Sequence, residues 1–68
     1  MDVRQLVGRN ALRFREERRM TQEELSTVSG LSQQYISDLE RGKRNPTVLT
    51  LYELATALHV RPRDFLEE

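Results

Sequence analysis

The sequence has no cysteine and only one histidine among its 68 residues. Without cysteine it can form neither a disulfide framework nor a thiolate zinc site, and a single histidine does not build a histidine metal cluster. No apolar run approaches the roughly 20 residues that span a bilayer, and no signal peptide opens the chain. We therefore expect a cytoplasmic protein with no membrane partner, no metal and no other cofactor.

The chain also lacks an excess of one charge, and it is short. Its 11 Lys and Arg residues balance its 11 Asp and Glu residues, so the composition gives no sign of nucleic-acid binding. A chain of this length buries only about 60% of the surface that its unfolded form exposes, which predicts one small domain over residues 1–68. A catalytic cleft is hard to build at this size, and no nucleophile–base pair is visible. The sequence predicts neither an enzyme nor a small-molecule substrate.

The few glycine and proline residues are spaced along the chain, at positions where they could separate short helices. No segment alternates apolar and polar residues as a strand would, so an all-α fold is predicted. The first helix is expected over residues 3–19, and Gly8 inside it costs about 1 kcal/mol relative to alanine. Its inward face repeats at helical spacing through Val3, Val7, Ala11, Phe14 and Arg18.

Capping residues mark the next helices. Thr21 and Glu24 form a capping box for a short second helix, which Gly30 ends in a left-handed conformation. Leu25 and Val28 are expected to face inward from this helix. The third helix is expected over residues 33–41 after a Ser32 cap, and the fourth over residues 48–58 after a Thr47 cap.

The chain after the fourth helix predicts a short fifth helix. Pro62 suits the first turn of such a helix, and Phe65 and Leu66 are expected to dock it on the core. His59 lies at the end of the fourth helix, where histidine tolerates a positive φ better than most residues.

The second and third helices are short and joined by a tight turn with glycine, which is typical of a helix-turn-helix. Ser26 is small enough to let the third helix approach closely. The side chains needed to hold the two helices at a steep angle are Leu25, Leu31, Ile36 and Leu39.

The tract from Gln22 to Pro46 resembles the XRE family, the Cro and phage-repressor type of helix-turn-helix domain. The resemblance extends over nearly the whole chain. It implies a compact five-helix, lambda repressor-like domain that binds a palindromic operator as a homodimer, with the third helix in the major groove of double-stranded DNA. We therefore predict a sequence-specific transcriptional regulator of the Cro-like or controller type. The sequence does not choose between repression and activation.

The resemblance assigns base-reading positions to the outer face of the third helix, namely Gln33, Gln34, Ser37 and Asp38. Glutamine can bond bidentately to adenine, and aspartate can accept from cytosine N4 although its charge repels phosphate. The predicted phosphate contacts are Gln22, Ser32, Arg41, Lys43, Arg44 and Asn45. Such contacts position a protein without reading sequence.

Some of these side chains have a simpler structural explanation. Gln33 and Gln34 would also suit a solvated helix start, and the basic residues after the third helix would suit a solvated helix end. Arg9 and Arg13 can contact DNA or pair with nearby glutamates.

Arg15 and Glu40 lie at the margins of apolar faces on helices that are expected to touch, where unpaired charge is rare. We favour an ion pair between them over DNA contact, and the resembled family has a pair at these positions. Removing one partner of such a pair is expected to be costly.

Apolar residues off the main stripes, such as Leu12, predict a protein interface. The resembled family dimerises near its fourth and fifth helices, so the predicted dimer interface is Leu49, Tyr52, Pro62, Arg63 and Leu66. The rival hypothesis is an antitoxin or antiactivator that keeps the fold and binds a regulatory protein partner instead of DNA.

Overall fold

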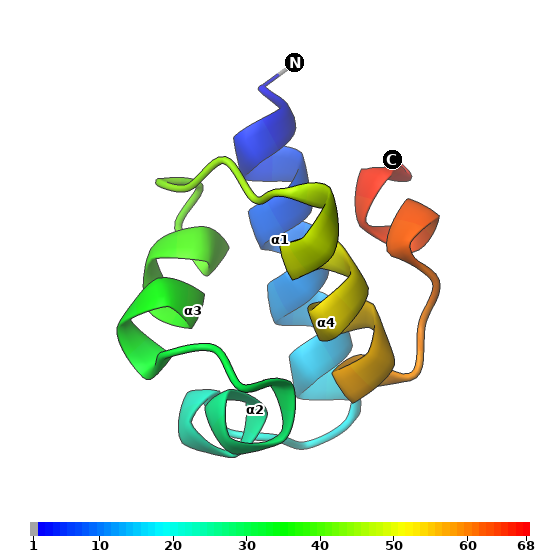
Figure 1. Ribbon diagram of the computed structural model, residues 1–68. Coiled ribbons are helices and arrows are strands. Elements are labelled where there is room, and N and C mark those ends of the chain that lie inside the picture. The colour runs from blue at the N-terminus through cyan, green and yellow to red at the C-terminus, as the bar shows by residue number, and fades with distance from the viewer. Residues whose placement is uncertain (1) are drawn as a thin grey trace.

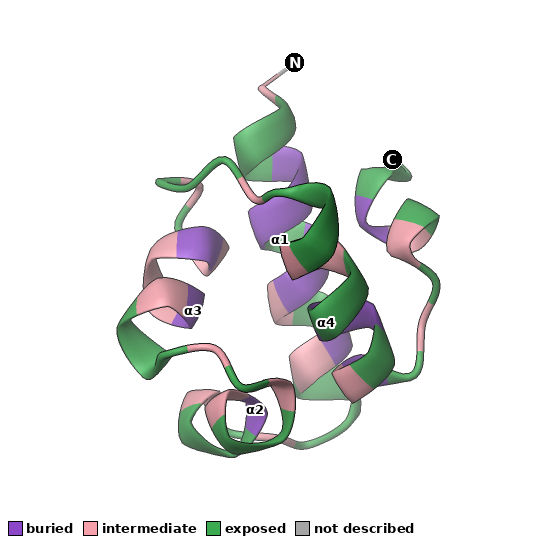
Figure 2. Cartoon of the chain, in the orientation of Figure 1, coloured by how far each residue is buried: buried purple, intermediate pink, exposed green. Residues whose placement is uncertain are grey.

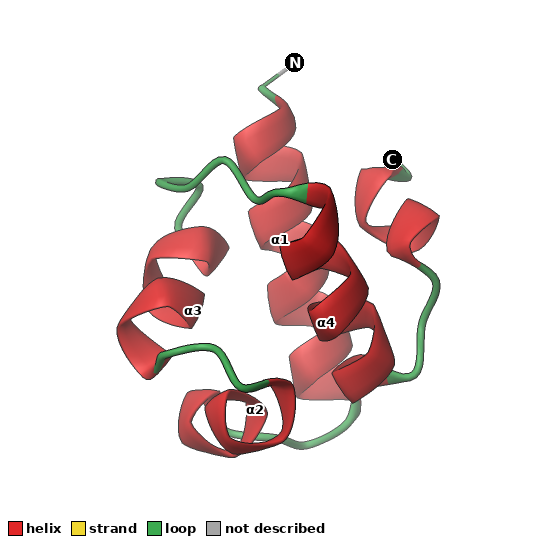
Figure 3. Ribbon diagram, viewed as in Figure 1, coloured by secondary structure: helices red, strands yellow, loops and turns green. Residues whose placement is uncertain are grey.

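The structure is a computed structural model that describes residues 2–68, in which helices surround one core (Figure 1). In chain order the elements are α1 (Val3–Glu17), α2 (Gln22–Ser29), α3 (Gln33–Glu40), α4 (Val48–Leu58) and the 3-10 helix η1 (Pro62–Leu66). The described part of the chain contains no strand (Figure 3), which confirms the all-α prediction.

The last element corrects the prediction of a fifth α-helix. η1 has only five residues, too few for a ladder of α-helical hydrogen bonds, and it winds as a 3-10 helix with Pro62 in its first turn. The Asp64 N–H donates to the Arg61 carbonyl at 2.9 Å. The Asp64 carboxylate in turn accepts from the Arg61 N–H at 2.8 Å. The domain is therefore four α-helices followed by one 3-10 turn.

The predicted caps are present. The Thr21 N–H donates to Glu24 Oε1 at 2.8 Å, and the Glu24 N–H donates to Thr21 Oγ1 at 3.0 Å. Gly30 ends α2 at φ 81°, and His59 ends α4 at φ 58°. α1 ends at Glu17, earlier than predicted, and Arg19 beyond it adopts φ 56°.

α1 lies between α3 and η1 and contacts both, while α2 packs against α3 and α4 (Figure 1). The buried faces of all five elements turn toward one another (Figure 2). The core consists of Val7, Ala11, Phe14, Leu25, Ile36, Leu39, Leu54, Ala55, Leu58 and Phe65. Phe65 meets Phe14 edge to face with ring centroids 5.5 Å apart, which docks η1 on α1.

Four residues expected to face the core do not. Val3 is 57% exposed, Val28 is 58% exposed and Leu66 is 50% exposed, and Arg18, just beyond the end of α1, is exposed as well. Leu25 alone fills the inward position of the short helix α2, and Phe65 alone fills that of η1. Each of these two short elements buries only one large side chain, so Val28 and Leu66 remain at the surface.

The inner face of α1 is wider than predicted because α3 and η1 contact it from two sides. It includes Asn10, which is only 4% exposed. The Asn10 side-chain amide donates to the Phe65 carbonyl at 2.7 Å and to the Glu67 carbonyl at 2.9 Å. This buried amide therefore has two backbone partners, and it ties α1 to the C-terminal end of η1.

Gly8 has a packing role that the sequence pattern did not indicate. A Cβ atom at this position would collide with the Leu39 carbonyl oxygen and would lie 3.0 Å from the Glu40 carbonyl oxygen. The end of α3 therefore rests directly on the backbone of α1, and only glycine permits this approach.

Candidate nucleic-acid interface

The two faces of α3 differ in how far their side chains are buried. Ile36 and Leu39 are fully buried on the inner face, as predicted, and Gln33 and Gln34 are exposed at the start of the helix. Ser32 is the N-cap and accepts from the Tyr35 N–H at 3.0 Å. The other two side chains assigned to base reading, Ser37 and Asp38, are half-buried.

The turn between α2 and α3 is held by two serine hydroxyls. Ser26 Oγ donates to the Leu31 carbonyl at 2.5 Å, and the Leu31 N–H donates to Ser29 Oγ at 3.2 Å. Leu31 is partly buried against the core. The serine at position 26 therefore remains compatible with close helix packing and adds a hydrogen bond to the turn.

An ion pair on the inner side of α3 joins this helix to α1. Arg15 Nε lies 2.6 Å from Glu40 Oε2, and Arg15 Nη2 donates to Glu40 Oε1 at 3.1 Å. Their side chains are 13% and 5% exposed. The hydrogen bond to Glu40 raises the pKa of the Arg15 guanidinium above its ordinary value.

Two further groups complete this inner network. Arg15 Nη1 donates to the Met20 carbonyl at 2.8 Å, and Gln22 Nε2 donates to Glu40 Oε1 at 2.9 Å. Gln22, assigned above to phosphate contact, is thus half-buried with one amide hydrogen bound to the protein.

A second polar network lies on the outer side of α3 and centres on Asp38. Its Oδ1 accepts from Arg41 Nη2 at 2.9 Å and from Gln34 Nε2 at 3.0 Å. Its Oδ2 lies 3.7 Å from Arg44 Nε. The hydrogen bond from Arg41, followed by that from Gln34, lowers the pKa of the Asp38 carboxyl below its ordinary value. Side chains assigned to bases and to phosphate are thereby joined in one cluster.

The loop after α3 is anchored to the helix by its backbone. The Gly42 N–H donates to the Leu39 carbonyl at 3.0 Å, and the Lys43 N–H donates to the Asp38 carbonyl at 2.9 Å. Gly42 adopts φ 77°, which favours glycine. Lys43, Arg44 and Asn45 are exposed, and the Arg44 guanidinium lies 5.0 Å from the centre of the Tyr35 ring.

The remaining basic candidates on α1 differ from each other. Arg13 pairs with Glu17 one turn later, with Nη1 and Oε2 3.3 Å apart, while Arg9 is exposed. The ion pair with Glu17 gives Arg13 a structural partner within α1, so its position needs no contact with DNA to explain it.

An open apolar groove of about 290 Å³ runs between the end of α2 and α4. It is lined by Val28, Ser29, Leu49, Tyr52, Glu53 and Thr56. Two of the predicted interface residues, Leu49 and Tyr52, are 69% and 61% exposed here. The other three lie on η1, where Pro62 is half-buried and Arg63 and Leu66 are exposed. Leu12 is half-buried and lies on α1.

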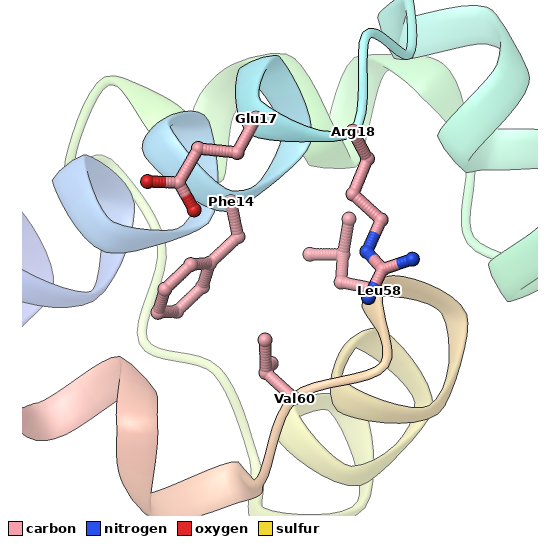
Figure 4. A pocket seen from close by; sticks show the side chains of 5 residues that line it. All are labelled: Phe14, Glu17, Arg18, Leu58 and Val60. Atoms are coloured by element: carbon pink, nitrogen blue, oxygen red, sulfur yellow. The ribbon is translucent and has the colours of Figure 1, made fainter.

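A different cleft, of about 310 Å³, lies at the end of α1. Figure 4 shows Glu17 and Arg18 at its edge and apolar side chains of Phe14, Leu58 and Val60 within it. Phe14 and Leu58 belong to the core. This cleft is therefore the open end of the core and includes no residue of α2 or α3.

Residues 2–68 hold no group of three His, Cys, Asp or Glu side chains that could bind a metal ion. None of the helices in the same range has the length and apolar character needed to cross a membrane.

Comparison with known proteins identifies relatives over most of the chain. A helix-turn-helix family model matches residues 12–65. The HTH-type transcriptional regulator y4dJ of Sinorhizobium fredii, itself uncharacterized, is 65% identical over 60 residues, which cover 88% of this chain and 78% of that protein.

Two solved structures of restriction–modification controller proteins share the fold. C.AhdI from Aeromonas hydrophila superposes with a TM-score of 0.87 at 34% identity, covering 91% of this chain and 94% of C.AhdI. C.Esp1396I, solved as a tetramer in complex with its natural 35 base-pair operator, has a TM-score of 0.86 at 34% identity and coverages of 96% and 86%. These matches confirm the resemblance drawn from residues 22–46, and the chain belongs to the XRE-type helix-turn-helix family of DNA-binding transcriptional regulators.

Proposed function

We propose that this protein regulates transcription by binding a palindromic operator as a homodimer, with α3 in the major groove. The observation that carries the proposal is the two-sided character of α3. Its inner face is fixed by buried Ile36 and Leu39, while Gln33 and Gln34 project from the opposite side. A helix held this rigidly can present side chains to base edges in a defined register. The C.Esp1396I complex with its operator supports the same mode of action.

The base contacts are assigned to Gln33, Gln34, Ser37 and Asp38. Each glutamine amide can both donate to and accept from an adenine edge. The Ser37 hydroxyl can do either, and the Asp38 carboxylate accepts from cytosine N4.

The phosphate contacts are assigned to both ends of α3. The hydroxyl of Ser32 lies at its start, and Arg41, Lys43, Arg44 and Asn45 follow its end. Gln22 can still contribute, because its amide has a second hydrogen beside the one that Glu40 accepts. These groups would set the position of α3 on the duplex.

The dimer contact is assigned to the exposed apolar groove between α2 and α4 and to η1. Leu49 and Tyr52 line the groove, and Val28 joins them there. Pro62, Arg63 and Leu66 would extend the contact along η1. Exposed apolar side chains of this size gather at protein interfaces, and a two-fold contact would set two α3 helices about 34–36 Å apart.

The test is selection of binding sites from a random duplex library with the purified protein. We expect a palindrome whose half-sites are about one helical turn apart. Gln33→Ala with Gln34→Ala should then weaken operator binding by about 2–6 kcal/mol for each half-site, since each bidentate pair is worth about 1–3 kcal/mol. Glu68→Gln, which changes an exposed side chain beyond η1, should change affinity little.

A selection with no sequence above background would contradict the proposal, as would a double variant that keeps full operator affinity. Either result would favour the rival function, in which the Val28–Leu49–Tyr52 groove binds a protein partner and α3 does not read bases.

A further inference from the structure

Asp38 is the one acidic side chain of α3 that is not committed to the inner network. α3 carries two acids, and Glu40 is held by Arg15 and Gln22 on the inner side. An outward carboxylate on a helix proposed to approach DNA repels phosphate. Its presence there calls for an explanation.

Asp38 contacts side chains that we propose to bind DNA. Oδ1 accepts from Gln34 at 3.0 Å and from Arg41 at 2.9 Å, and Oδ2 faces Arg44 at 3.7 Å. The carboxylate side chain is 20% exposed, whereas Arg41 and Arg44 are 56% and 48% exposed. In the free protein, one carboxylate therefore holds a proposed base reader and two proposed phosphate contacts.

The arrangement is fixed by the backbone as well as by charge. The Lys43 N–H donates to the Asp38 carbonyl at 2.9 Å, so the loop that carries Arg44 is tied to the residue that Arg44 faces. The Tyr35 ring, 5.0 Å from the Arg44 guanidinium carbon, supports the same position. These cations are thus oriented toward Asp38 before DNA arrives.

We propose that Asp38 determines specificity by lowering affinity for unmatched DNA, an inference that rests on the proposed function. While Arg41 and Arg44 pair with Asp38, they neutralise less phosphate charge, and non-specific affinity depends on the phosphates neutralised. A cytosine facing Asp38 offers its N4 amine to the carboxylate in place of Arg41. The guanidinium is then released to phosphate, so a matched site gains two contacts at once.

A guanine or a thymine facing Asp38 cannot make this exchange, and adenine makes it less well because its N7 acceptor lies beside the N6 amine. Guanine O6 and N7 and thymine O4 are acceptors, and they repel a carboxylate. Arg41 and Arg44 then either remain paired with Asp38, or they leave the carboxylate with no hydrogen-bond donor to replace them. Because the whole chain has a net charge of zero, the few cations beside α3 dominate its attraction for random DNA.

The test compares Asp38→Asn with Glu68→Gln, which removes the same charge. Glu68 is exposed and follows η1, on the other side of α1 from α3 (Figure 1). Binding of the full chain to the selected operator and to a random duplex is measured over a range of salt. We expect Asp38→Asn to tighten random-duplex binding about 3- to 10-fold and to steepen the slope of log K against log salt by about 0.9 for each guanidinium released.

Two further results are expected for Asp38→Asn. The ratio of operator to random affinity should fall, and a new library selection should lose the cytosine preference at the position that faces residue 38. Glu68→Gln should change both quantities less. Circular dichroism would establish that the variants are folded, and Asp38→Ser, which also removes the charge, is measured in parallel.

If Asp38→Asn and Glu68→Gln change random-duplex affinity and salt slope equally, net charge alone acts and the inference is overturned. An unchanged ratio of operator to random affinity would overturn it too. Failure of the proposed function is seen separately, in a wild-type protein that selects no sequence.

Discussion

Two polar networks on the same short helix show how differently one kind of ion pair can be used. Glu40 turns inward and pairs with Arg15, which is 25 residues away in sequence and lies on another helix. Asp38 turns outward and pairs with Arg41 and Arg44, which follow it closely in the chain. The helical period of 3.6 residues places these two acids, only two positions apart, on different sides of α3. The inner pair joins α3 to α1, and the outer cluster holds side chains that we propose to contact DNA.

Solvent decides the energetic difference between the two networks. The Glu40 side chain is 5% exposed and the Arg15 side chain is 13% exposed, so removal of either partner leaves a charge that has little access to water. The cations around Asp38 are about half exposed, and water and salt screen such pairs strongly. Disruption of the inner network should therefore act on folding, and disruption of the outer cluster on binding.

The largest expected effect comes from Glu40→Gln. It should lower the free energy of unfolding by about 3 kcal/mol, at the lower end of the range for buried pairs because Arg15 is partly exposed. Chemical denaturation followed by circular dichroism measures the change. For a domain of this size the loss is a large part of the total stability.

Replacing both inner partners separates the ion pair from simple packing. Arg15→Met with Glu40→Leu removes both charges together and should recover most of the stability lost in Glu40→Gln. A double variant as unstable as the single one would show that the inner network contributes more than charge pairing.

Gly8→Ala should have an intermediate effect through the backbone contact beneath α3. Alanine gains about 1 kcal/mol of helix propensity over glycine. The new methyl group would collide with the Leu39 carbonyl oxygen, and such overpacking costs about 1–3 kcal/mol. We expect a net loss of about 1 kcal/mol in the same denaturation experiment.

Arg9→Ala, at the exposed neighbouring position of α1, provides the control and should change stability by less than about 0.5 kcal/mol. A Gly8→Ala protein more stable than wild type would mean that α1 and α3 are not in this close contact.

The smallest expected effect is the pH dependence of the outer cluster. The pKa of Asp38 is lowered in the folded protein from its ordinary value of 3.8, first by the hydrogen bond from Arg41. The resulting stability is fully present above pH 3.8 and is lost as the pH falls through the folded pKa. Acid denaturation of wild type and Asp38→Asn should therefore converge at low pH, and high salt should reduce the difference. A difference that grows on acidification would contradict the assigned pairing.

Most of the fold was predictable because its determinants are local. The capping box at Thr21, the left-handed Gly30 and the caps at Ser32 and Thr47 depend on residues within a few positions of one another. The buried positions of α3 followed from helical spacing. The fifth element was predicted in its place but not in its type, because five residues leave the choice between α and 3-10 winding to their packing.

The candidate interface was predictable only as a set of positions. Helical spacing separated Gln33 and Gln34 from Ile36 and Leu39, and the family resemblance gave them a role. Nothing in the sequence indicated that Asp38 holds Gln34, Arg41 and Arg44 at the same time. Nor did it join Val28 to the apolar groove, since periodicity placed this side chain inside.

The sequence by itself determined where each helix begins, which face of it is apolar and which family the chain resembles. Those properties depend on backbone hydrogen bonds and side-chain spacing within a few residues. Tertiary structure alone decided that Gly8 receives the end of α3 and that Asn10 holds η1, and it set the 2.6 Å distance of the Arg15–Glu40 pair that the sequence predicted. These contacts join residues at least 25 positions apart, and their geometry exists only once the hydrophobic core has fixed the angles between helices.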